Sequence, residues 1–117
     1  MRPEERDPGL LWDMQKAVRG LLGFVEGKTY QDVLDNEGLR LIVERELEII
    51  GEAASKISPA FREAHPEIAW RSIIGLRNVI VHAYGDIDYE RLWQIVINQI
   101  PELQALLQNL VKDIRSE

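Results

Sequence analysis

Residues 37–57 read EGLRLIVERELEIIGEAASKI, and this stretch decides the fold class. Its apolar residues recur at steps of three and four, the spacing of one face of an α-helix. The stripe consists of Leu39, Val43, Leu47, Ile50, Ala54 and Ile57, and it is widened by Ile42, Ile49 and Ala53. So broad an apolar face predicts a long helix that packs against more than one neighbour.

The segment before this helix also has helical periodicity. Asp7 and Pro8 predict a helix start, because a carboxylate can cap free N–H groups and proline has no N–H to lose at the first helical position. That helix is expected to run to about Gly27. Thr29 then predicts a short turn of helix that ends at Leu34.

Two helices are predicted directly after the long one. Ser58 and Pro59 open a short helix, which ends at His65 because the residue before a proline is disfavoured in helical geometry. One continuous helix is then expected from near Ile68 to Tyr84, closed by Gly85.

The last predicted helix completes an all-α fold. Asp86 or Asp88 can cap it, and it is expected to meet Pro101 with a kink and to end near Leu110. No alternating strand pattern, internal repeat or linker is visible in the 117 residues. The chain therefore predicts a single domain over residues 1–117, a bundle of about four to six helices with an antiparallel core.

The composition limits the kinds of site that the chain can hold. Cysteine is absent, which excludes disulfide scaffolds, thiolate metal sites and cysteine nucleophiles, and no metal or cofactor is expected. No stretch approaches the roughly 20 apolar residues of a membrane span, so a cytoplasmic protein is expected. The net charge of -6 argues against a protein that holds duplex nucleic acid mainly by phosphate attraction.

The second informative stretch is residues 77–84, RNVIVHAY, in which Arg77, Asn78, His82 and Tyr84 interrupt an apolar run. Polar side chains in such a run must find partners or be exposed in a cleft. Since each helical residue advances about 100°, Arg77 and His82 lie about 140° apart on one straight helix. Loosening of the last turn would reunite them, as would a second copy of the helix across a two-fold axis, which we prefer.

These residue types suit RNA cleavage without a metal. The imidazole of His82 can move the proton of a 2′-hydroxyl or of the leaving oxygen, and the guanidinium of Arg77 can stabilise the phosphate as charge builds. Asn78 can orient the imidazole or a phosphate oxygen. The alternative is an ordinary helix end, with His82 and Tyr84 near the last carbonyls and Arg77 paired with a carboxylate.

A set of charged residues on the long helix has two interpretations. Arg45, Glu48 and Glu52 share one helical face, and the simpler interpretation is a solvated ladder of ion pairs. The other places Glu52 beside Arg77 as an orienting carboxylate. Gly51 would let another helix approach closely at that point, at a cost of about 1 kcal/mol in helix propensity.

Three segments of the chain carry a resemblance to a known family. They are residues 45–54 (RELEIIGEAA), 65–70 (HPEIAW) and 75–84 (GLRNVIVHAY). In this order they resemble the HepT-like branch of the HEPN ribonucleases, and the likeness extends from about residue 9 to about residue 110. The resemblance implies a HEPN-type bundle and a homodimer in which two motif helices form one cleft.

The resemblance also implies a function. It implies the toxin of a type VII toxin–antitoxin system, a metal-independent endoribonuclease with Arg77 and His82 as catalytic residues. Tyr84 matches the tyrosine to which a minimal nucleotidyltransferase antitoxin of the MntA type attaches AMP, which would repel RNA from the cleft. The alternative is a catalytically silent helical dimer that binds a nucleotidyltransferase or a nucleotide.

The acidic charge of the chain fits an RNA-cleaving surface awkwardly. Such a surface should be locally positive. The basic residues expected near Arg77 are Arg71, six residues earlier, and Arg40 and Arg45 on the long helix.

Overall fold

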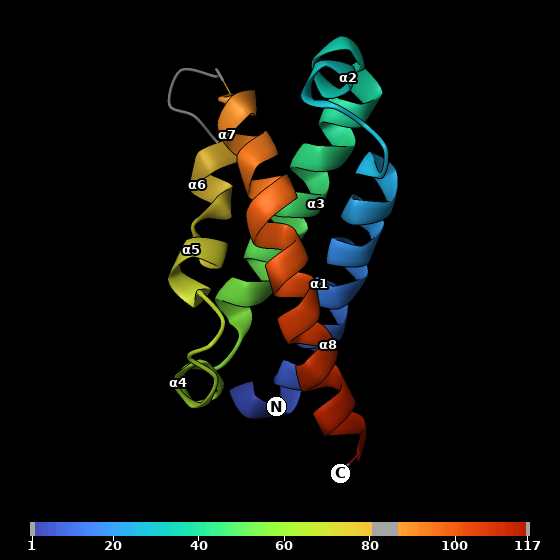
Figure 1. Ribbon diagram of the computed structural model, residues 1–117. Coiled ribbons are helices and arrows are strands. Elements are labelled where there is room, and N and C mark those ends of the chain that lie inside the picture. The colour runs from blue at the N-terminus through green and yellow to red at the C-terminus, as the bar shows by residue number, and fades with distance from the viewer. Residues whose placement is uncertain (1, 81–86, 117) are drawn as a thin grey trace.

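The computed structural model describes residues 2–80 and 87–116, which are helical and contain no strand (Figure 1). The elements are α1 (Pro3–Val25), α2 (Tyr30–Asp35), α3 (Glu37–Lys56), α4 (Pro59–Ala64), α5 (Trp70–Ile74), α6 (Leu76–Ile80), α7 (Tyr89–Gln94), the π-helical segment η1 (Ile95–Gln99) and α8 (Ile100–Ser116). The predicted all-α bundle is confirmed.

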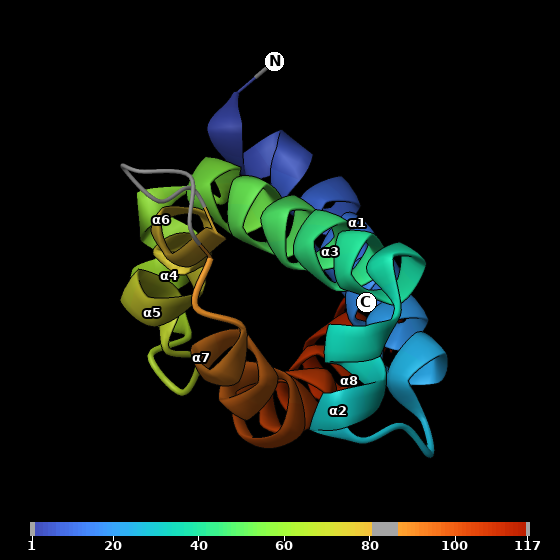
Figure 2. The ribbon, with the colours of Figure 1, turned by 90° about the horizontal axis from the view of Figure 1, so that it is seen from above.

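The helices surround one core. α3 packs against α1 on one side and against α5 and α6 on the other, and α8 packs against α1. Seen from above, α7, η1 and α8 form one rod that lies across from α3 (Figure 2). Gln99 of that rod donates a hydrogen bond to Ser72 of α5, with 2.7 Å between Nε2 and Oγ. The wide apolar face of residues 37–57 therefore serves several neighbours, as its width predicted.

The predicted start of the first helix is wrong. The helix begins at Pro3, and Asp7 lies inside it, almost fully buried. Its carboxylate caps no turn of its own helix but accepts hydrogen bonds from the backbone N–H and the hydroxyl of Ser58, at 2.8 and 2.6 Å. Because Ser58 in turn caps α4, Asp7 ties α1 to the beginning of α4.

The helix predicted from Ile68 to Tyr84 is interrupted at Gly75. The backbone N–H of Gly75 closes α5 by donating to Arg71 O, and α6 then starts at Leu76. A Cβ atom at Gly75 would lie 3.2 Å from Arg71 O, so the absence of a side chain lets the backbone turn tightly between the two helices, each of which keeps an apolar face in the core. The buried residues of the two helices are Trp70, Ile73, Leu76 and Ile80. Residues 81–84 of the predicted helix lie outside the described residues.

The last predicted helix is confirmed in outline. Asp88 caps α7 by accepting from the backbone N–H of Arg91, whereas Asp86 lies outside the described residues. Near Pro101 the structure has a π-helical segment, in which the N–H of Ile100 donates to Ile95 O. A proline ring clashes with the carbonyl four residues earlier in a regular α-helix, and wider turns just before it relieve that clash. The helix continues past Leu110 to Ser116.

Candidate functional site

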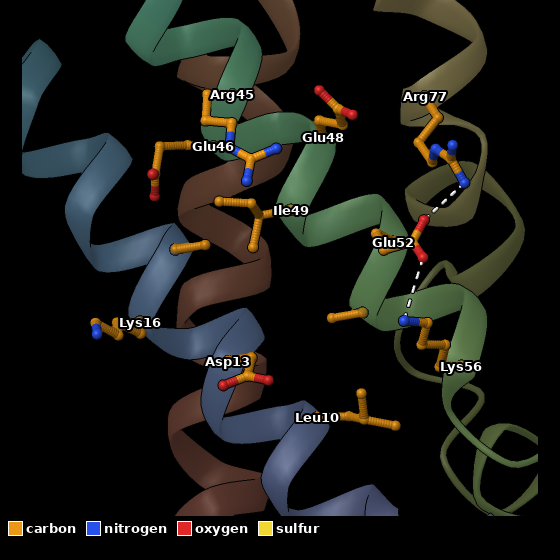
Figure 3. A pocket seen from close by; sticks show the side chains of 12 residues that line it. Leu10, Asp13, Lys16, Arg45, Glu46, Glu48, Ile49, Glu52, Lys56 and Arg77 are labelled. Carbon is orange, nitrogen blue, oxygen red and sulfur yellow. Dashed lines mark hydrogen bonds and ion pairs between the residues drawn. The ribbon is translucent and has the colours of Figure 1, made fainter.

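An open groove of about 620 Å³ lies between α1, α3 and α6 (Figure 3). It is lined by Leu10, Asp13, Lys16, Ala17, Arg45, Glu46, Glu48, Ile49, Glu52, Ala53, Lys56 and Arg77. Four of these side chains are acidic and four are basic, so the groove is close to neutral although the chain is acidic. Sequence reasoning missed Lys16 and Lys56, because no motif marks either lysine.

Arg77 lies at the edge of this groove and is held by Glu52. Its Nη1 donates to Oε2 of Glu52 at 2.6 Å, while Oε1 of Glu52 lies 3.3 Å from Nζ of Lys56. Figure 3 shows the carboxylate between the two cations. The Arg77 and Glu52 side chains are 51% and 41% exposed, so solvent reaches the pair. The contact fits both interpretations of Arg77, since it orients the guanidinium and also satisfies it.

Gly51 sets how closely α6 approaches α3. A Cβ atom at this position would lie 3.2 Å from Ile73 O and 3.3 Å from Cγ of Arg77. A methyl group would therefore push against the backbone of α5 and against the side chain of Arg77. The predicted close approach at Gly51 is confirmed, and it is what brings Arg77 within reach of Glu52.

Of the two interpretations of the charged face of α3, the structure shows the contact of Glu52 with Arg77 and, among the described residues, no ion pairs linking Arg45, Glu48 and Glu52. Arg45 and Glu48 line the groove with Glu52, yet within the described part of the chain neither forms an ion pair or a hydrogen bond. Their neighbour Glu46 packs over Gly20 of α1, with Oε2 3.3 Å from the position of a Gly20 Cβ. Burial raises the pKa of Glu46, an effect that the charges of Arg45 and Lys16 oppose.

A second polar contact joins the other end of α3 to the start of α7. The hydroxyl of Tyr89 donates to Oε2 of Glu44 at 2.8 Å, and the guanidinium carbon of Arg40 lies 5.9 Å from the centre of the tyrosine ring. Burial and the bond to Glu44 raise the pKa of Tyr89. Arg40 also donates to Leu34 O. No sequence signal pointed to this contact, because its partners lie 45 residues apart.

The basic residues expected near Arg77 are only partly brought together. Arg45 lines the same groove, whereas Arg40 contacts Tyr89 and Arg71 of α5 lies outside the groove. Asn78 follows Arg77 on α6 and is exposed. His82 and Tyr84 lie outside the described residues, so their predicted roles stay predictions.

Two further properties concern residues 2–80 and 87–116. No cluster of three or more His, Asp or Glu side chains in this part of the chain is arranged to hold a metal ion. In the same part, every helix is too short or too polar to cross a membrane.

Comparison with known proteins identifies the family. The family described as "Ribonuclease HepT-like" matches residues 14–110. A Methanocaldococcus jannaschii protein named "Putative RNase" is 37% identical over 94 residues, which cover 80% of this chain and 86% of the relative. A Thermococcus cleftensis protein named "Probable ribonuclease HepT" is 35% identical over 102 residues, 87% of this chain and 93% of the relative. No solved structure gives a significant match. The chain belongs to the HepT-like ribonuclease family.

Proposed function

We propose that this protein is a metal-independent endoribonuclease and the toxin of a type VII toxin–antitoxin system in the cytoplasm. The observation that carries the proposal is the place of Arg77, exposed at the edge of the groove with its guanidinium held by Glu52 at 2.6 Å. A guanidinium is permanently charged and presents a rigid fork of donors that matches phosphate oxygens. Membership of the HepT-like family supports RNA as the substrate.

In the proposed reaction, the imidazole of His82 accepts the proton of the 2′-hydroxyl. The 2′-oxygen attacks the phosphorus, the bond to the 5′-oxygen breaks, and the leaving oxygen takes up a proton from the imidazolium or from water. Arg77 stabilises the charge that builds on the phosphate, Asn78 orients the imidazole or a phosphate oxygen, and Glu52 holds Arg77. A homodimer supplies the second copy of the motif.

RNA cleavage by the purified protein in the presence of a chelator tests the catalytic assignment. Arg77→Ala and His82→Ala are each expected to lower the rate by about 100-fold or more, because each removes a group that acts in the transition state. Arg71→Ala is the matched control, since it removes an exposed arginine outside the groove, and it should cleave like the wild type. Equal cleavage by all three variants would exclude Arg77 and His82 as catalytic residues.

The proposed regulation is attachment of AMP to Tyr84 by a nucleotidyltransferase antitoxin of the MntA type. Incubation with ATP and that enzyme should add the mass of one AMP to the wild type and none to Tyr84→Phe. Tyr30→Phe and Tyr89→Phe are controls that keep Tyr84 and should be modified normally. A Tyr84→Phe variant that still gains the mass would move the acceptor to another residue.

A second function, a catalytically silent dimer that binds the nucleotidyltransferase or a nucleotide, is favoured by one observation. The guanidinium of Arg77, which would have to bind a phosphate, is already paired with Glu52, and three further carboxylates line the groove. This function predicts a wild type that gains AMP mass but cleaves no RNA in the chelator assay. Cleavage that is lost in His82→Ala would contradict it.

A further inference from the structure

The exposed side of α3 carries one continuous stripe of residues. Leu41, Arg45, Glu48, Glu52 and Lys56 follow one another at steps of four, three, four and four, so they lie along one face of the helix. Leu41 is 56% exposed, an unusual position for a leucine on a helix with so wide a buried face. This α3 stripe borders the groove that Arg77 lines.

Two charges at the centre of the α3 stripe form no ion pair or hydrogen bond in the described part of the chain. Glu52 pairs with Arg77 and Lys56, whereas Arg45 and Glu48 form no such contact, and the charge of Arg45 acts only at longer range on Glu46. Glu48 is half-buried and forms no ion pair in the described part of the chain. An opposite charge supplied from outside the chain would give its carboxylate a partner.

A second copy of the same chain can supply that charge. In an interface with two-fold symmetry, residue i of one copy contacts residue j of the other, and j contacts i. If two α3 helices pack antiparallel about an axis between residues 45 and 48, each Arg45 faces a Glu48, and two ion pairs form at once. A parallel arrangement would instead place Arg45 against Arg45.

The surroundings of Arg45 and Glu48 favour this occupant over a highly charged one. Leu41 on the stripe and Leu10 and Ile49 in the groove offer apolar surface beside the ion pairs. The groove carries four acidic and four basic side chains, so two copies can approach through it although each has a net charge of -6.

We propose that the α3 stripe is the seam between two copies of this chain, with Arg45 of each copy paired with Glu48 of the other. This inference rests on the homodimer of the proposed function and names its surface. The Glu52 position lies about 8 Å along α3 from the two-fold axis, at 1.5 Å per residue. Both copies of Arg77 would therefore lie close to one seam.

Reversal of the two charges tests the seam without RNA. The mass of the purified protein in solution, measured by sedimentation over a range of concentrations, should be that of a dimer for the wild type. Arg45→Glu and Glu48→Arg each place like charges opposite one another and should raise the dimer Kd at least tenfold. The double variant Arg45→Glu/Glu48→Arg restores opposite charges and should restore the dimer.

Two controls make the charge reversals specific. Glu63→Arg on α4 and Arg71→Glu on α5 reverse charges outside the groove and should remain dimeric. Circular dichroism of every variant checks that it is folded. If either single variant keeps the wild-type Kd, or if the double variant stays monomeric while folded, the seam is refuted.

The remaining outcomes separate the seam from the proposed function. A wild type that is monomeric refutes the seam. If that monomer binds the nucleotidyltransferase and both single variants lose this complex, the α3 stripe binds the transferase and not a second copy of the chain. If the protein cleaves RNA and its dimer is unchanged by both charge reversals, the proposed function is supported and the seam is refuted. If the dimer responds to the reversals as predicted but the protein cleaves no RNA, the seam is supported and the proposed function is refuted.

Discussion

The two sides of α3 hold their neighbours in different ways. The core side, formed by Val43, Leu47, Ile50 and Ala54, is buried in the hydrophobic core. The motif side meets α6 through Gly51, which has no side chain, and through the half-exposed ion pair between Glu52 and Arg77. The core side therefore supplies stability, whereas the motif side supplies the position of one arginine.

This difference predicts that stability and activity respond to different substitutions. Changes on the core side should unfold the bundle and lower activity only through unfolding. Changes on the motif side should cost less stability than changes on the core side and should act on RNA cleavage. The following substitutions test this division, from the largest expected effect to the smallest.

Leu47→Ala should have the largest effect on stability. Leu47 is 0% exposed, and truncation of a wholly buried leucine costs about 2–5 kcal/mol because it leaves a cavity. The free energy of unfolding in urea measures the loss. Ile97→Ala, at an exposed isoleucine of η1, is the control and should change that free energy by only about 0.5 kcal/mol. Equal losses in the two variants would contradict the core side as described.

Gly51→Ala should have an intermediate effect. The added methyl group lies 3.2 Å from Ile73 O and 3.3 Å from Cγ of Arg77, and overpacking of this kind costs about 1–3 kcal/mol. A gain of about 1 kcal/mol in helix propensity opposes it, so a net loss of up to about 2 kcal/mol is expected.

Gly23→Ala is the matched control for Gly51→Ala. Gly23 also lies inside a helix, but a Cβ there meets no atom within 4 Å. This variant should gain about 0.5–1 kcal/mol from helix propensity alone. A Gly51→Ala protein that is stabilised as much as Gly23→Ala would show that α6 moves away freely.

Glu52→Gln should show whether the ion pair positions Arg77 or stabilises the fold. The pair with Arg77 is half-exposed, so its loss should change the free energy of unfolding by less than about 1 kcal/mol. Cleavage of RNA should nevertheless fall by about tenfold, since the guanidinium loses its charged acceptor. Glu63→Gln is the control for an exposed carboxylate without this contact. If Glu52→Gln lowers the free energy of unfolding but leaves RNA cleavage unchanged, the ion pair stabilises the fold and does not position Arg77 for cleavage.

The core side could be predicted from the sequence, and the motif side only in part. The period of Leu39 to Ile57 predicted α3 to within one residue at its end, because burial of an apolar face selects that spacing directly. The break at Gly75 was missed, since the apolar spacing of residues 70–80 continues through it. Contacts such as Asp7 with Ser58 join residues 51 apart, and no local pattern reports them.

The candidate site shows the same limit. Gly51 and Glu52 are adjacent in the sequence. A glycine next to a carboxylate allowed the inference that another helix approaches the long helix closely at Gly51 and that Glu52 is a partner for Arg77. Whether Arg45 and Glu48 pair within one helix depends on side-chain placement, which spacing does not determine. They share a face and still remain apart within the described part of the chain.

Glu46→Gln should have the smallest effect, and one that depends on pH. Burial raises the pKa of Glu46 above its ordinary value of 4.5, so the folded protein keeps this proton to a higher pH than the unfolded chain does. The wild type therefore loses stability as the pH rises from the unfolded value through the folded one, because the ionised carboxylate is disfavoured over Gly20. Glutamine does not titrate and escapes this loss.

The gain in stability of Glu46→Gln over the wild type should thus be greater at neutral pH than in acid. Urea unfolding of both proteins at intervals between about pH 4 and about pH 8 measures it. Glu63→Gln makes the same change at an exposed position and corrects for the removal of one negative charge from an acidic chain. If Glu46→Gln gains no more than Glu63→Gln at neutral pH, the cations Arg45 and Lys16 offset the cost of burial. The groove beside α1 then tolerates an ionised carboxylate as readily as open solvent does.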